Sequence, residues 1–350
     1  MNMKSSIWIL GIMLLAAGSA GATPFSHLYV FGDSLSDAGE HPSAVMSLYK
    51  ILANNCDPAH RCGAGLYYDG RISNGPVAAE YLADSLFPGN AAPPAYLSYA
   101  VAGATSGIGN YGDGGSATER GDKLPIPVPG IFPLPGMRGE VDKYKDDIGS
   151  TGGQADPEAL FFLWGGSNDY LTGSSPVEAA RNIAGYASEL ADAGARRFFI
   201  PNLVDLSKTP YVSVLTDEQR MQAQAFSLAF NNELDIQLNG LETQFPDASI
   251  IQFDTYALLN SVIADPAQFG FADVSNPCLT SGPCADPDSF LFWDGFHPTT
   301  RGHAILAAAF ASAVPEPEAA IMFVTGLLLL GSVSSRSRRA IRLASALDGA

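Results

Sequence analysis

Basic residues are scarce in this sequence. Lysine and arginine together number 19 among 350 residues, against 36 aspartates and glutamates, and the formal net charge is −17. A protein that binds nucleic acid needs a basic surface to neutralise phosphates. The charge balance therefore excludes nucleic acid as a partner.

Three motifs that carry well-known chemistry are missing. The chain has no H-E-x-x-H sequence, no G-x-x-x-x-G-K phosphate loop and no G-x-G-x-x-G after a strand-like segment. His27, His41 and His60 stand in no metal-ligand pattern, and His303 reads as a surface or packing residue of a terminal helix. We therefore expect no metal and no cofactor. The sequence gives no support for a metalloprotease, a nucleotide hydrolase or a dinucleotide-dependent enzyme.

Cysteine is also rare, with four in the chain. Cys56 and Cys62 form one pair in the sequence and Cys278 and Cys284 another, each six residues apart in a loop rich in proline, aspartate or glycine. Two local disulfides are the simplest interpretation, and they suit an exported protein. Zinc is the alternative, although neither pair has the close C-x2-C spacing of zinc sites.

The first 22 residues have the pattern of a secretory signal peptide. Lys4 precedes an apolar stretch over residues 7–17, and Ala20-Gly21-Ala22 forms an A-x-A cleavage site. We expect signal peptidase to remove residues 1–22 as the chain leaves the cytoplasm.

Residues 314–350 show three features in succession. A Pro-Glu-Pro sequence at 315–317 precedes an apolar segment, 319–335, and four arginines follow at or after position 336. This order resembles the PEP-CTERM sorting signal of Gram-negative bacteria. The resemblance implies a transient transmembrane segment, cleavage by an exosortase-like enzyme, and delivery to the cell surface or extracellular matrix. A plain membrane anchor is the alternative, and the arginines would give it the same orientation.

Between these ends, residues 23–313 read as one domain of alternating strands and helices. Residues 159–164 form an unbroken apolar run, and in the segment 197–200 an arginine is followed by three apolar residues; both patterns are typical of buried parallel strands. Amphipathic helices are expected over 137–147, 176–193 and 216–245. This alternation predicts an α/β sandwich around a mainly parallel sheet.

The segment Gly32-Asp33-Ser34-Leu35 follows an apolar run and precedes a stretch that reads as a helix. A strand-to-helix turn lifts a hydroxyl to the edge of a sheet and leaves backbone amides free beside it. Ser34 is therefore a candidate nucleophile.

A serine hydroxyl needs a base to take its proton, and the base needs a third group to orient it. Asp294 and His297 stand three residues apart in a loop before the terminal helix and can fill these roles. Negative charge that develops on a carbonyl oxygen is stabilised by hydrogen-bond donors that are already positioned around that oxygen. Ser34 and Gly103 can offer backbone N–H groups, and Asn168 can offer its side-chain amide.

Four ordered segments of the chain resemble the sequence blocks of the GDSL, or SGNH, family of esterases and lipases. They are Gly-Asp-Ser-Leu at 32–35, Gly103, Gly-Ser-Asn-Asp at 166–169, and Asp294-x-x-His297. The resemblance implies a flavodoxin-like three-layer sandwich with a five-stranded parallel sheet, and ester hydrolysis through an acyl-enzyme without a cofactor. By the same resemblance, Ser34, Asp294 and His297 form the catalytic triad, and Ser34, Gly103 and Asn168 form the oxyanion hole.

The substrate is not fixed by these motifs. A glycine- and proline-rich loop over 107–136 is expected to shape access to the site, and its Tyr111, Ile131 and Phe132 favour an acyl chain, as in a lipase or phospholipase. Delivery to the extracellular matrix would instead suit an O-acetylesterase that acts on extracellular polysaccharide. A matrix-associated protein that keeps the scaffold without turnover is the remaining alternative.

Overall fold

The computed structural model describes residues 25–39, 66–89, 95–122, 133–150 and 152–314. All of them belong to one structural unit, Phe25–Pro315. The predicted signal peptide, the C-terminal tail and the pair Cys56 and Cys62 lie outside the described residues.

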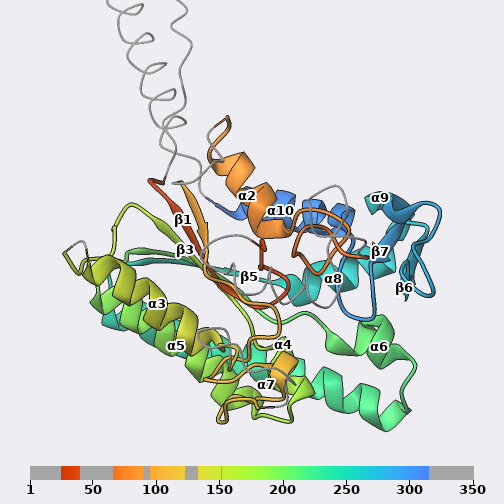
Figure 1. Ribbon diagram of the computed structural model, residues 1–350, viewed down its shortest axis with the longest axis horizontal. Coiled ribbons are helices and arrows are strands. Elements are labelled where there is room, and N and C mark those ends of the chain that lie inside the picture. Colours follow the sequence, from red (N-terminus) through yellow and green to blue (C-terminus); the bar gives the residue numbers. More distant parts are fainter. Residues whose placement is uncertain (1–24, 40–65, 90–94, 123–132, 151, 315–350) are drawn as a thin grey trace, which may run out of the picture. The chain divides into compact units, whose positions relative to one another are not determined.

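A five-stranded sheet with the strand order β2-β1-β3-β4-β5 forms the centre of this unit (Figure 1). Every pair of neighbouring strands is parallel. The strands are β1 (Leu28–Gly32), β2 (Tyr96–Ser98), β3 (Leu160–Trp164), β4 (Arg197–Pro201) and β5 (Ser249–Phe253). Because parallel strands end at the same edge, the segments after β1, β3, β4 and β5 meet there.

The central strands are buried because helices cover both faces of the sheet. All five residues of β3 are buried, which explains their unbroken apolar sequence. The predicted α/β sandwich with a five-stranded parallel sheet is confirmed.

Three long helices pack against one face of the sheet (Figure 1). They are α3 (Met137–Gly149), α5 (Pro176–Asp192) and α7 (Asp217–Gln244). The Ser175 side chain caps α5, with proline at the first helical position, and Thr216 and Gln219 form a capping box on α7. These local signals explain why the predicted bounds of α5 and α7 agree with the structure to within a residue.

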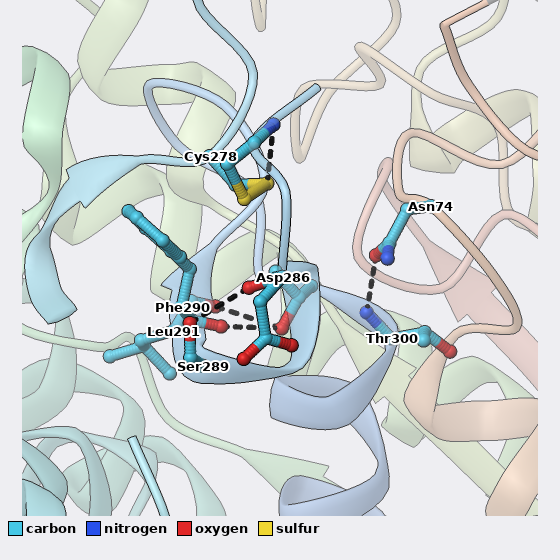
Figure 2. The surroundings of a disulfide bond; sticks show 9 residues. Asn74, Cys278, Asp286, Ser289, Phe290, Leu291 and Thr300 are labelled. Carbon is cyan, nitrogen blue, oxygen red and sulfur yellow. Dashed lines mark hydrogen bonds between the residues drawn. A yellow bond between two sulfur atoms is a disulfide. The ribbon is translucent and has the colours of Figure 1, made fainter. Parts of the chain in front are cut away.

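The opposite face is covered by α2 (Ala78–Leu86) and α10 (Thr300–Ala313). Phe310 of α10 packs its ring against Phe162 and Phe199 of the sheet. A hydrogen bond of 2.8 Å from the Thr300 amide to Asn74 Oδ1 ties the start of α10 to the loop before α2 (Figure 2).

The segment between β5 and α10 contains more regular structure than its sequence indicated. It forms α8 (Thr255–Ala264), α9 (Pro266–Phe269) and a two-stranded parallel sheet of β6 (Asp273–Pro277) and β7 (Phe290–Phe292). A disulfide joins Cys278 to Cys284 (Figure 2). The Cys278 amide donates to the Phe292 carbonyl over 3.0 Å, which fixes this loop beside β7.

The shorter helical elements lie in the connections. They are α4 (Ser167–Leu171), α6 (Pro210–Ser213), η2 (Tyr111–Asp113), η3 (Leu206–Lys208) and η4 (Pro287–Ser289). Across the described ranges, no helix is long and apolar enough to cross a membrane. The predicted transmembrane segment, 319–335, lies outside those ranges.

Candidate active site

Ser34 lies on a hydrogen-bonded turn directly after β1. Asp33 makes this turn, because its carbonyl accepts from the amides of Ser36 and Asp37, and its Oδ1 accepts from the Leu35 amide over 3.0 Å. The helix expected after Ser34 is wrong for the described residues up to Gly39, which form only this turn. Asp37 ends the turn, because its Oδ1 accepts from the Gly39 amide, which a continuing helix would direct to the Leu35 carbonyl.

Gly32 permits the close approach of β1 and β3 just before this turn. A Cβ atom at this position would lie 2.1 Å from the Trp164 carbonyl oxygen. Any side chain at position 32 would therefore push the two strand ends apart and displace Ser34.

His297 and Asp294 lie within hydrogen-bonding distance of Ser34 and of each other. His297 Nε2 is 2.8 Å from Ser34 Oγ, and His297 Nδ1 is 2.8 Å from Asp294 Oδ1. The backbone amides of Phe296 and His297 also donate to Asp294 Oδ1, so the carboxylate shapes the loop that carries the histidine. The structure thus brings together a serine and a histidine that are 263 positions apart in the sequence.

The low pKa of Asp294 indicates the direction of these hydrogen bonds. Burial by itself would raise this pKa, but the charge of His297 and the hydrogen bonds from His297 and Phe296 outweigh burial and lower it to about 2. The carboxylate is therefore ionised at neutral pH and accepts the Nδ1–H of His297. The other ring nitrogen, Nε2, is then the acceptor for the Ser34 hydroxyl proton.

Tyr67 contacts this group and was missed by the sequence interpretation. Its hydroxyl donates to Asp294 Oδ2 over 2.9 Å. Burial and the neighbouring negative charge of Asp294 raise the pKa of Tyr67, so the phenol remains protonated and can donate. No local pattern around Tyr67 could have indicated a contact that spans 227 positions.

Gly103 and Asn168, the other two predicted oxyanion donors, line the same cavity as Ser34. Gly103 has a φ of 83°, and a Cβ there would lie 2.4 Å from Asn110 Oδ1, so the turn requires glycine. Asn168 donates through Nδ2 to the Ala104 carbonyl over 2.9 Å, which fixes its amide and leaves a second N–H on the same nitrogen.

One buried carboxylate holds the two backbone segments that carry Ser34 and Gly103. Glu140 on α3 accepts from the Gly32 amide over 2.8 Å and from the Val101 amide over 3.1 Å. Burial raises the pKa of Glu140 well above its ordinary value, although these two amides act against that rise. Glu140 therefore fixes the end of β1 relative to the turn after β2.

A cavity of about 260 Å³ opens beside Ser34 and His297. Tyr111 from the predicted access loop is on its wall, as expected, while Ile131 and Phe132 lie outside the described residues. Most of its other walls are apolar, and one of them comes from α8, β7 and α10. The sequence interpretation did not find this part of the site because it treated residues 254–290 as a mixed loop.

His303 does not belong to the site. It is fully buried on α10, and its Nδ1 accepts a hydrogen bond of 3.2 Å from the Ala78 amide at the start of α2. Burial, and next the charge of His297, lower its pKa to about 3. The expected packing role is thus the one observed.

Comparison with known proteins identifies relatives of this arrangement. Residues 28–310 match the family described as GDSL-like lipase/acylhydrolase. The chain is 32% identical over 324 residues to a protein encoded in the trpE-trpG intergenic region of Pseudomonas putida, covering 85% of this chain and 50% of that protein. It is 29% identical over 320 residues to esterase EstA of Pseudomonas aeruginosa, covering 84% and 47%.

A third relative is similar over nearly its whole length. The phosphatidylcholine-sterol acyltransferase of Aeromonas hydrophila is 27% identical over 350 residues, covering 94% of this chain and 91% of that enzyme. The chain spans about half the length of the Pseudomonas relatives that it matches.

Proposed function

The chain belongs to the GDSL-like lipase/acylhydrolase family, and from this premise we propose that it is an exported serine hydrolase that cleaves carboxylic esters through an acyl-enzyme. The observation that carries the proposal is the hydrogen-bonded series Ser34, His297 and Asp294 at the wall of an apolar cavity. The relatives named as an esterase and an acyltransferase support acyl transfer as the reaction class.

In the proposed mechanism, Ser34 Oγ forms a bond to the carbonyl carbon of the ester while its proton passes to His297 Nε2. Asp294 holds the imidazole through Nδ1 and stabilises its protonated form. The tetrahedral intermediate then collapses, the alcohol leaves with the proton from His297, and Ser34 carries the acyl group. Water then bonds to the acyl carbon and gives its proton to His297; the second tetrahedral intermediate collapses, the bond from that carbon to Ser34 Oγ breaks, Oγ takes the proton back from His297, and the carboxylic acid leaves.

The charge on the tetrahedral oxygen is proposed to be stabilised by three donors: the backbone N–H groups of Ser34 and Gly103, and Nδ2 of Asn168. Within the described residues, neither of the two backbone N–H groups donates a hydrogen bond to another protein atom, so both are available to a substrate. Donors that are fixed before the reaction stabilise the developing charge without reorganisation.

The location of the enzyme is proposed from the sequence of its ends. Residues 1–22 would direct export and be removed by signal peptidase, and the hydrolase domain, 23–313, would act outside the inner membrane. Residues 314–350, with the transmembrane segment 319–335, would serve as a PEP-CTERM-like tail that anchors the chain in the membrane until an exosortase-like enzyme cleaves it, after which the domain reaches the cell surface or extracellular matrix of a Gram-negative bacterium.

The direct test is hydrolysis of p-nitrophenyl esters by the wild type and by Ser34→Ala. The variant should lose turnover by about a thousand-fold or more while keeping its circular dichroism spectrum and unfolding temperature. Near wild-type turnover by a folded Ser34→Ala variant would overturn the proposed mechanism.

A further inference from the structure

Apolar side chains from two helices and one strand form a wall of the cavity beside Ser34. They are Leu258, Leu259 and Val262 of α8, Ile305 and Leu306 of α10, and Leu291 of β7. On α8 these positions follow the three- and four-residue spacing of one helix face, so the lining is a continuous apolar stripe. Figure 2 shows Leu291 on β7, close to the disulfide loop.

Val262 and Leu291 belong to a small buried core, and Leu258, Leu259 and Ile305 pack against that core while also lining the cavity. Leu258, Leu259, Ile305 and Leu306 are only partly buried. The same helices have small residues on their solvent face, where Ala257 and Ala308 are exposed. An interior apolar face that remains partly accessible forfeits packing contacts, which a ligand of matching chemistry would restore.

The polar groups near this wall are already used within the protein. The hydroxyl of Thr255, at the start of the α8 stripe, donates to the Asn202 carbonyl. Among the residues that line the cavity, those with an ionisable side chain are Asp33, Tyr111 and His297, and none of them lies on α8, α10 or β7. A ligand that extends along α8 and α10 therefore meets hydrocarbon alone.

We propose that this wall is the binding site for the acyl chain of the substrate, and that it selects straight alkyl chains of medium length. The proposal rests on the ester hydrolysis proposed above and names the substrate class. Thr255 and Val262 are the first and last α8 residues that line the cavity, and their separation of seven residues is roughly 10 Å at the helical rise of about 1.5 Å per residue. Because C–C bonds of about 1.5 Å zigzag at tetrahedral angles, an extended alkyl chain advances about 1.25 Å per carbon, and a lining of that length accommodates roughly eight carbon atoms.

Apolar burial predicts how the rate should depend on chain length. Each added methylene that enters the wall raises kcat/KM roughly fourfold, equivalent to about 0.8 kcal/mol. The gain should stop when the chain reaches the end of the stripe. The expected profile for p-nitrophenyl esters from acetate to palmitate is thus a steep rise to about eight carbons, followed by a plateau or a fall.

This series separates the two proposals. A rise with chain length supports the acyl site. Hydrolysis of acetate at a rate that longer chains do not exceed overturns the acyl site and leaves the esterase intact, as an enzyme for small acyl groups. A folded protein that hydrolyses no ester of any length overturns both.

Blocking variants locate the site on the two helices. Ile305→Phe on α10 and Leu259→Phe on α8 each add a ring to the wall, and each should lower the octanoate-to-acetate ratio of kcat/KM by at least tenfold. The matched control is Ala308→Phe, which adds a ring on the exposed face of α10 and should leave the ratio unchanged. Unfolding temperatures show whether each variant is folded. A ratio that is unaffected in both blocking variants would overturn the proposal, as would an equal fall in the control.

Discussion

The Tyr67 hydroxyl donates a hydrogen bond of 2.9 Å to Oδ2 of Asp294, the atom opposite the one that holds the backbone amides of the histidine loop. The proposed catalytic aspartate therefore has donors on both of its oxygens. This contact distributes the charge of the carboxylate between His297 and a phenol, and removing it should change how strongly the carboxylate attracts a proton on His297.

Tyr67→Phe should move the acid limb of the kcat/KM pH profile upward by roughly 0.5 to 1 pH unit, because the unshared carboxylate stabilises protonated imidazole more strongly. We also expect kcat to fall by roughly three- to tenfold. Tyr81→Phe is the matched control, since that hydroxyl bonds to Thr300 Oγ1 and not to Asp294. If the acid limb stays in place in Tyr67→Phe, Tyr67 has only a structural role.

Glu140→Leu should destabilise the protein by roughly 2–4 kcal/mol, because two buried amides lose their acceptor. It should also lower kcat, since the segments that carry Ser34 and Gly103 lose their common anchor. Asp142→Ala, on the exposed face of the same helix, should change stability by less than about 0.5 kcal/mol. Urea unfolding and p-nitrophenyl ester kinetics measure both effects, and a fully stable Glu140→Leu variant would contradict this role.

Asn168→Ala should reduce kcat by roughly a hundredfold with little change in KM, because the amide is proposed to bind the oxyanion and not the ground-state ester. Asn168→Asp should be at least as impaired, since it replaces a donor with a negative charge. An effect confined to KM or to the unfolding temperature would remove Asn168 from the oxyanion hole.

Stability should fall on acidification partly because of His303. The pKa of His303 is about 3 in the folded protein, against an ordinary value of 6.5. At a pH between these two values, the unfolded chain binds a proton on this histidine and the folded chain does not. The stability from neutral His303 is present in full above pH 6.5 and declines below it, by up to roughly 1.4 kcal/mol per pH unit. His303→Gln keeps an acceptor for the Ala78 amide and should show a shallower decline. Equal slopes for both proteins would show that His303 does not contribute.

The sequence predicted those parts of the molecule that local patterns encode. Apolar runs identified β3 and β4, and capping residues identified the ends of α5 and α7. The residues Ser34, Asp294 and His297 were found through short motifs, and the structure brings them within hydrogen-bonding distance of one another. Their catalytic roles remain predictions.

The features that were missed depend on tertiary contacts. Tyr67 reaches Asp294 only because the loop before α2 folds over the site, and nothing next to it in sequence indicates this. The apolar stripe of α8 was overlooked because the proline, aspartate and glycine residues of its segment led to the interpretation of residues 254–290 as a loop. The helix expected after Ser34 is a turn in the structure because the Asp37 side chain takes the Gly39 amide. For Tyr67 and for this turn, a specific side-chain contact decided the outcome.

The central claim is that Ser34 is an activated nucleophile, and intact-mass and peptide mass spectrometry after treatment with a fluorophosphonate tests it most directly. One covalent adduct is expected, on the peptide that contains Ser34, and it should be absent in Ser34→Ala and strongly reduced in His297→Ala. A folded wild-type protein that forms no adduct, or an adduct that persists at another residue in Ser34→Ala, would contradict the account.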